Sequence, residues 1–150
     1  MAIVYPNLEV PMGRVDTTLT ITNNADHIRA AAGDLAADSV RSVTLEGVLV
    51  DTGATLLCLP ADVIARLGLR PSREVTIRTA AGPRRSRLFQ DARLAVMGRE
   101  DTFSCLELPE GAEPLLGVIP LEALGLDPDV ENQRLRALPD GPTDTYITVL

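Results

Sequence analysis

Hydrophobic and polar residues alternate in short runs along much of the chain, which predicts a mostly β structure. Between residues 14 and 22, the positions that suit one buried strand face are Val15, Thr17, Leu19 and Ile21. Residues 40–50 resume the pattern, with inward positions at Val43, Leu45 and Val48. Residues 2–5 suit a separate short strand.

Residues 74–90 predict a β-hairpin with small residues at its tip, 80–83. Two further strands are predicted at residues 93–97 and 102–108. The arginines on the hairpin are Arg78, Arg84, Arg85 and Arg87. They predict a solvated face, and an attraction to acidic substrates is the alternative.

Two short helices are predicted from proline near the start and glycine at the end. In residues 59–68, Pro60 lies in the first turn and Gly68 at the stop. Pro120 and Gly125 repeat this order, and an apolar strand and a glycine turn precede both helices. We interpret the two stretches as a weak internal repeat.

Residues 23–39 break the strand pattern and predict either a short surface helix at 25–32 or a mobile loop. His27 lies in this polar stretch. A single histidine in such a place is usually solvated, and we assign it no role.

The most informative stretch is an apolar strand, residues 48–50, that leads directly into Asp51, Thr52 and Gly53. A carboxylate at the end of such a strand is costly to bury unless it is hydrogen-bonded or shares a proton. Gly53 allows a sharp turn and close approach of a ligand. The stretch therefore suits either chemistry or a tight Asx-type turn.

Composition narrows the classes of function. The 150 residues suit a single domain, and a net charge of −7 with no Trp argues against nucleic acid as a partner. No apolar run suits a membrane span and no secretion leader is recognisable, so we expect a cytoplasmic protein. Cys58 and Cys105 are too few for a disulfide framework or a thiolate zinc site, and we expect no metal and no cofactor. All 14 basic residues are Arg, which we interpret as a bacterial coding bias.

The chain resembles the retropepsin-like aspartic proteases in three places. These are residues 48–59, the glycine-tipped hairpin around Gly82, and Leu115-Leu116-Gly117 with its following helix. The resemblance implies an all-β acid protease fold, with a closed β-barrel, a flap hairpin and one or two short helices, built as a homodimer. The core would span about 14–138, with 23–39 as an insertion and 139–150 as a tail or interface strand.

By the same resemblance, the protein would be an aspartic endopeptidase with Asp51 as the catalytic residue. Two carboxyls must share a proton in this chemistry, and only one Asp-Thr-Gly is present. The second acid would come from a second copy of the chain. The remaining residues with implied roles are Thr52, Gly53, Ala54 and Thr55 in the active-site loop, Ala80, Ala81 and Gly82 in the flap, Cys58 and Val118 lining the cleft or the core beneath it, and Leu115, Leu116 and Gly117 in a strand under the loop.

The chain also departs from the viral pattern. Where viral members often carry acids and an arginine that brace the dimer, it has Thr55, Leu56 and Val118. Three segments compete for the interface strands, namely 2–5, 134–138 and 146–150. Two rival hypotheses remain: a catalytically silent dimeric peptide-binding or scaffold module on the same fold, and an unrelated monomeric β-barrel with a coincidental turn.

Overall fold

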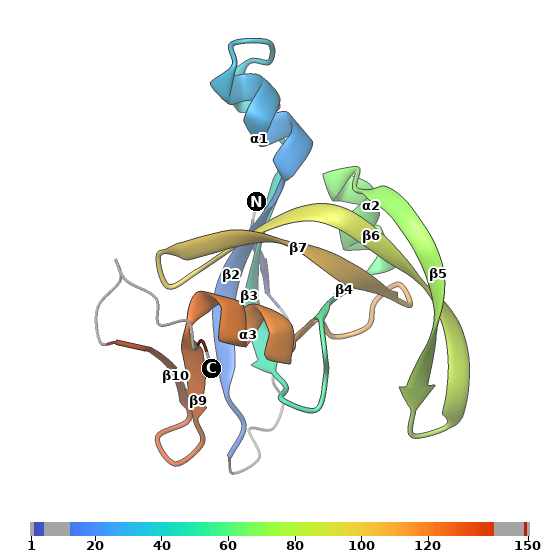
Figure 1. Cartoon of the computed structure of the whole chain (residues 1–150), viewed down its shortest axis with the longest axis vertical. Helices are drawn as coiled ribbons and strands as arrows, with labels where there is room; N and C mark the ends of the chain where they lie inside the picture. Colours follow the sequence, from blue (N-terminus) through green and yellow to red (C-terminus); the bar gives the residue numbers. More distant parts are fainter. Residues whose placement is uncertain (1, 5–12, 140–148, 150) are drawn as a thin grey trace.

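Strands make up most of the molecule. The computed structural model describes residues 2–4, 13–139 and 149, and these contain three α-helices and one short 3-10 helix besides the strands (Figure 1). The mostly-β prediction is confirmed, with more helices than the one or two expected. The division into core, insertion and tail stays a prediction.

The main sheet is built from eight strands, one of which pairs only with its hairpin partner. The strands are β1 (Ala2–Val4), β2 (Asp16–Asn23), β3 (Ser42–Val50), β4 (Leu57–Pro60), β5 (Arg70–Thr79), β6 (Gly82–Val96), β7 (Arg99–Leu108) and β8 (Leu115–Leu116). Neighbours pair in the order β1-β3-β2-β6-β7-β4-β8, and β8 pairs back with β3 while β5 pairs with β6. Six strands from β3 round to β8 are therefore connected in a ring of pairings.

The alternation along the first strands sets the core. The residues of β2 and β3 that face it, together with the residue before β2, are Val15, Leu19, Ile21, Val43, Leu45 and Val48, all buried. A register shift between Thr17 and Leu19 interrupts the pairing of β2 with β3. The inward positions are those that the sequence predicts, except for Thr17, which is only half-buried. Burial of this apolar face is the main stabilising term of such a sheet.

The predicted internal repeat corresponds to two helices of the same length. Helices α2 (Ala61–Leu67) and α3 (Val118–Leu124) each end at a glycine in the left-handed conformation, with φ 62° at Gly68 and 65° at Gly125. Glycine adopts this conformation without the steric cost of a Cβ atom. The prediction that the first helix starts at residue 59 was wrong, because β4 pairs with β7 up to Pro60.

Residues 23–39 contain helix α1 (Asn24–Ala31) and the 3-10 helix η1 (Ala37–Ser39), so the helical alternative is confirmed. Figure 1 shows α1 projecting beyond the end of β2 and β3. The Asn23 side chain caps α1 by accepting a hydrogen bond from the Asp26 amide, and it donates one to the Leu67 carbonyl at the end of α2. Arg41 then forms an ion pair with the buried Asp26 carboxylate at 2.8 Å.

The hairpin is longer than the sequence indicated. β5 and β6 pair from Arg70–Gln90 at the base to Thr79–Gly82 at the tip. β6 continues without a break to Val96, so a separate strand at 93–97 was a wrong prediction. A register shift between Phe89 and Ala92 lets one long strand pair with β5 at one end and with β2 at the other.

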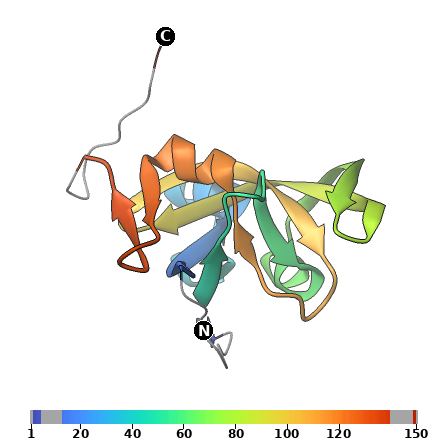
Figure 2. The same cartoon turned by 90° about the horizontal axis from the view of Figure 1, so that it is seen from below.

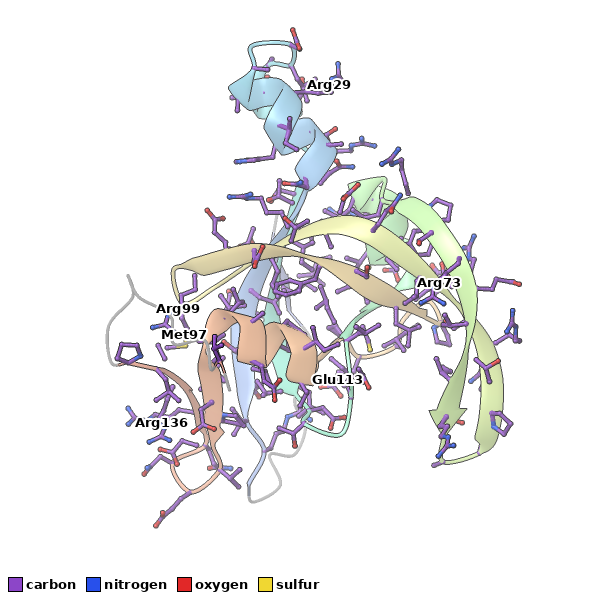
Figure 3. All side chains as sticks on the ribbon, viewed as in Figure 1. Arg29, Arg73, Met97, Arg99, Glu113 and Arg136 are labelled. Atoms are coloured by element: carbon purple, nitrogen blue, oxygen red, sulfur yellow. The ribbon has the colours of Figure 1, made fainter. Side chains whose placement is uncertain are left out.

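The last described strands form a separate hairpin, β9 (Leu126–Asp129) with β10 (Arg134–Ala137). Figures 1 and 2 show it on the opposite side of the molecule from the β5–β6 tip. The buried Arg99 side chain, labelled in Figure 3, donates to the carbonyls of Leu124, Gly125 and Leu138, which ties this hairpin to α3. Of the candidate interface strands, 134–138 is therefore largely β10, 2–5 is largely β1, and 146–150 lies outside the described residues except for Val149.

Candidate active site

Asp51 lies at the point where β3 ends, between two strands that are distant in sequence. The short strand β8 pairs in parallel with β3, with Leu116 opposite Val50, and antiparallel with β4, with Leu116 opposite Leu57. The backbone N–H of Asp51 donates to the Leu116 carbonyl at 3.0 Å. The two arms of the Asp51 loop are therefore held on either side of β8.

The loop itself is a tight turn around the Asp51 side chain. The Gly53 amide donates to the carboxylate oxygen Oδ1 at 2.8 Å, and the Ala54 amide donates to the Asp51 carbonyl at 3.0 Å. The Asx-type turn therefore exists. It leaves a chemical role open, because the second oxygen, Oδ2, accepts no hydrogen bond from the residues that the structure describes.

The N-terminus of helix α3 is hydrogen-bonded to the Asp51 loop. The first amide groups of a helix have no partner within it. Those of Val118 and Ile119 donate to the loop carbonyls of Ala54 and Thr55, each at 2.9 Å. The loop that carries the carboxylate is therefore held to α3 by backbone hydrogen bonds, which do not depend on the side chains at these positions.

Solvent reaches most of the loop in the single chain. Asp51 and Ala54 are half-buried, whereas Thr52, Gly53 and Thr55 are exposed. No group of His, Cys, Asp and Glu suitable for holding a metal ion occurs among the described residues. The same part of the chain has no helix long and apolar enough to cross a membrane.

The hairpin predicted as the flap has a two-residue turn, Ala80 and Ala81, and Gly82 already belongs to β6. The Thr79 hydroxyl donates to the Gly82 carbonyl at 2.7 Å and accepts from the Ala81 amide at 3.2 Å. Gly82 has φ 106°, which favours glycine. In Figure 2 the tip extends away from the ring of strands.

Cys58 and Val118 lie close to the loop but differ in exposure. Cys58 is buried in β4, and Val118 is half-buried at the start of α3. Burial, together with the charge of Asp51, raises the pKa of the Cys58 thiol to about 11. Cys105 on the neighbouring strand is also buried, which raises its pKa to about 12. Both thiols are therefore neutral at ordinary pH.

Sequence reasoning missed an ion pair near the loop. Arg14 donates to the carboxylate of Glu113, and this hydrogen bond raises the pKa of Arg14 above its usual range. The Val15 carbonyl accepts from the amide of Val50, the residue before Asp51. The pair therefore connects the entry to β2 with the entry to β8, and only long-range pairing could have revealed it.

A groove of about 420 Å³ was also not foreseen. It lies between the β5–β6 hairpin and the end of β7, and its walls include Ile77, Arg84 and Leu108. The sequence predicted the hairpin but did not show which part of the chain it would lie against.

Comparisons with known proteins assign the chain to a protein family. Among solved structures, the chain is similar to the EIAV protease complexed with the inhibitor HBY-793, with 20% sequence identity, a TM-score of 0.49, and coverage of 79% of this chain and 95% of that one. No curated protein matches the sequence. The family model described as gag-polyprotein putative aspartyl protease matches residues 42–123, a stretch that contains β3, the Asp51 loop, the hairpin, β8 and most of α3. Since this match spans more than half of the chain, the protein belongs to the gag-polyprotein putative aspartyl protease family.

Proposed function

We propose that the protein is an aspartic endopeptidase that is active as a homodimer, with one Asp51 from each subunit. The observation that carries this proposal is the geometry of the Asp51 carboxylate. The Asp51 amide donates to the Leu116 carbonyl at 3.0 Å, and the Gly53 amide donates to Oδ1 of the carboxylate at 2.8 Å. These two bonds fix the position of the side chain and leave Oδ2 available to a water or a second carboxyl. Membership of an aspartyl protease family supports the same chemistry.

The reaction needs two carboxyl groups that share one proton. One takes a proton from the attacking water, and the other donates a proton to the scissile carbonyl oxygen. Among the described residues, no second carboxyl is hydrogen-bonded to Asp51. A twofold axis beside the loop supplies the second Asp51, because a twofold interface brings identical surfaces together.

The exposed part of the loop is the surface that such an axis would cover. Thr52 and Thr55 are exposed, and the Thr52 hydroxyl is free to bond across the axis to its counterpart. The flap residues Ala80, Ala81 and Gly82 would close over a bound peptide and exclude water from the reaction.

The first test is Asp51→Asn, assayed with a mixed peptide library at mildly acid pH. We expect cleavage to fall to background while the circular dichroism spectrum is unchanged. Asp101→Asn is the matched control, because Asp101 also precedes a threonine and its Oδ1 accepts the next amide, at 2.7 Å, but it lies in β7. Cleavage retained by the Asp51 variant would remove this residue from the mechanism.

Mixing the two proteins tests whether one carboxyl comes from each subunit. In an equal mixture of exchanging subunits, about a quarter of the dimers carry two wild-type chains, so activity should fall to about a quarter of that of pure wild type at the same total concentration. A fall to one half would mean that each subunit works alone. A stable dimer that binds peptides but cleaves none would instead identify a silent peptide-binding module.

A further inference from the structure

The groove beside the hairpin combines apolar walls with a concentration of arginines. Its apolar lining includes Ile77 from β5, Leu108 at the end of β7, and Pro109 directly after it. Arg84 pairs with Ile77 in the register of the hairpin, so their side chains share one face. Arg85 and Arg87 also border the groove, as do Glu74 and Glu107.

Two of the three arginines are neutralised within the protein. Arg87 donates to both carboxylate oxygens of Glu107, at 3.0 Å and 2.8 Å. Arg85 forms an ion pair with Glu74 at 3.3 Å. Arg84 forms no ion pair with any residue in the described ranges, so the groove carries one positive charge without a partner.

The position of the groove relative to Asp51 follows from β4. Leu57, at the start of β4, pairs with Leu116 beside the Asp51 loop. At the other end, Pro60 pairs with Leu108 of the groove wall. At about 3.3 Å per residue, the three steps from Leu57 to Pro60 put the groove wall roughly 10 Å from the base of the loop, or about three residues of extended peptide.

We propose that the groove binds an Asp or Glu side chain of the substrate, three or four residues from the scissile bond, and that Arg84 determines this specificity. An arginine fork binds a carboxylate through two parallel hydrogen bonds, and the attraction between the two charges is stronger in a groove than in open water. The methylene groups of the acidic side chain would lie against Ile77 and Leu108. This inference rests on the proposed peptidase function for the position of the scissile bond.

The test uses peptides of one cleavable sequence that carry Glu or Gln at each position in turn. For wild type, we expect kcat/KM to favour Glu over Gln about fivefold at a position three or four residues from the cleaved bond. Arg84→Gln should abolish that preference. Arg78→Gln is the matched control, because Arg78 pairs with Pro83 on the opposite face of the same hairpin tip and should keep the preference.

A binding measurement separates failure of this inference from failure of the proposed function. Fluorescence anisotropy with labelled versions of the same peptides, on the Asp51→Asn protein, requires no cleavage. We expect tighter binding of the Glu peptide than of the Gln peptide, and loss of the difference when Arg84→Gln is added. If wild type cleaves no peptide but this difference in affinity appears, the proposed carboxylate site in the groove is supported and the proposed peptidase function is refuted. Equal affinities, or a preference that survives Arg84→Gln, would overturn the groove proposal whether or not peptides are cleaved.

Discussion

A Cβ atom on Gly117 would lie 2.4 Å from the carbonyl oxygen of Leu56. It would also lie 2.7 Å from the Ala54 carbonyl oxygen, so backbone atoms on both sides of the loop exclude any side chain. Gly117→Ala must therefore displace the Asp51 loop. We expect a loss of about 2 kcal/mol in the free energy of unfolding, measured by urea titration, and loss of peptide cleavage.

Gly33→Ala is a suitable comparison for this variant. Gly33 has φ 82°, and a Cβ atom there would have no neighbour within 4 Å. The substitution carries only the cost of the left-handed conformation, about 1 kcal/mol, and should leave cleavage unchanged. Normal activity in Gly117→Ala would show that the loop tolerates movement.

Asp26 should stabilise the insertion through Arg41. The Arg41 side chain donates to both Asp26 oxygens, at 2.8 Å and 3.0 Å, and the Arg41 amide adds a third bond at 3.0 Å. These bonds hold the pKa of Asp26 below its usual value of 3.8. We expect Asp26→Asn to lower the free energy of unfolding by about 2 kcal/mol at pH 7.

The pH dependence of this contribution follows from the direction of the shift. Because the folded state holds the carboxylate ionised, the contribution is complete above pH 3.8 and is lost as the pH falls through the lowered pKa. Wild type and Asp26→Asn should therefore converge in stability below that range. Asp38→Asn, at an exposed position in η1, serves as the control and should match wild type at every pH. A difference between wild type and Asp26→Asn that is the same at pH 7 and pH 2 would contradict the assignment.

Local patterns in the sequence were sufficient for β2 and β3 and for most of their buried positions. Alternation at Leu19, Ile21 and Leu45 corresponds to burial at 0–1% exposure, because one apolar face must leave water. The glycines that end α2 and α3 could also be predicted from the sequence, since few other residues adopt the left-handed backbone conformation found there. The start of α2 was misplaced because Leu59 and Pro60 are held in β4 by partners far along the chain.

The candidate site was predictable to the extent that it depends on backbone chemistry. The Asp51-Thr52-Gly53 turn follows from local rules. The need for glycine at position 117 does not, because it comes from the backbone of Ala54 and Leu56, far away in the sequence. The groove and the Arg14–Glu113 ion pair depend on which strands become neighbours in the fold. The two side chains of the ion pair are 99 residues apart in sequence. Residue spacing carries no signal for such contacts.

Thr79 should determine how well the hairpin tip is ordered. Its hydroxyl makes two hydrogen bonds across the tip, at 2.7 Å and 3.2 Å. Thr79→Val keeps the shape and removes both bonds. We expect faster hydrogen exchange of the Ala81 amide. On the proposed peptidase function we also expect a severalfold higher KM for peptides, since a less ordered hairpin tip would close over the substrate less often. Thr76→Val changes the same kind of residue on the opposite face of β5, so unchanged exchange at Ala81 in Thr79→Val, or equal effects of both variants, would refute this role.

The two buried cysteines should make the free energy of unfolding depend on pH in the alkaline range. The thiols of Cys58 and Cys105 have pKa values raised from 9.0 to about 11 and about 12, with burial as the main cause. The unfolded chain therefore loses these protons before the folded chain does. The free energy of unfolding should be insensitive to the cysteines below pH 9 and should then fall by about 1 kcal/mol per pH unit for each cysteine until the folded thiols ionise.

The composition of the chain makes this effect measurable. All 14 basic residues are Arg, so lysine does not titrate in this window, and the chain has only two Tyr. A Cys58→Ala, Cys105→Ala double variant should be less stable at pH 7 because of the lost packing, but its stability should fall less steeply above pH 9. An aromatic disulfide reagent at pH 8 should label wild type only as fast as the protein opens, and should label it completely in urea. Rapid labelling of folded wild type, or equal alkaline slopes in both proteins, would show that the thiols are accessible to solvent.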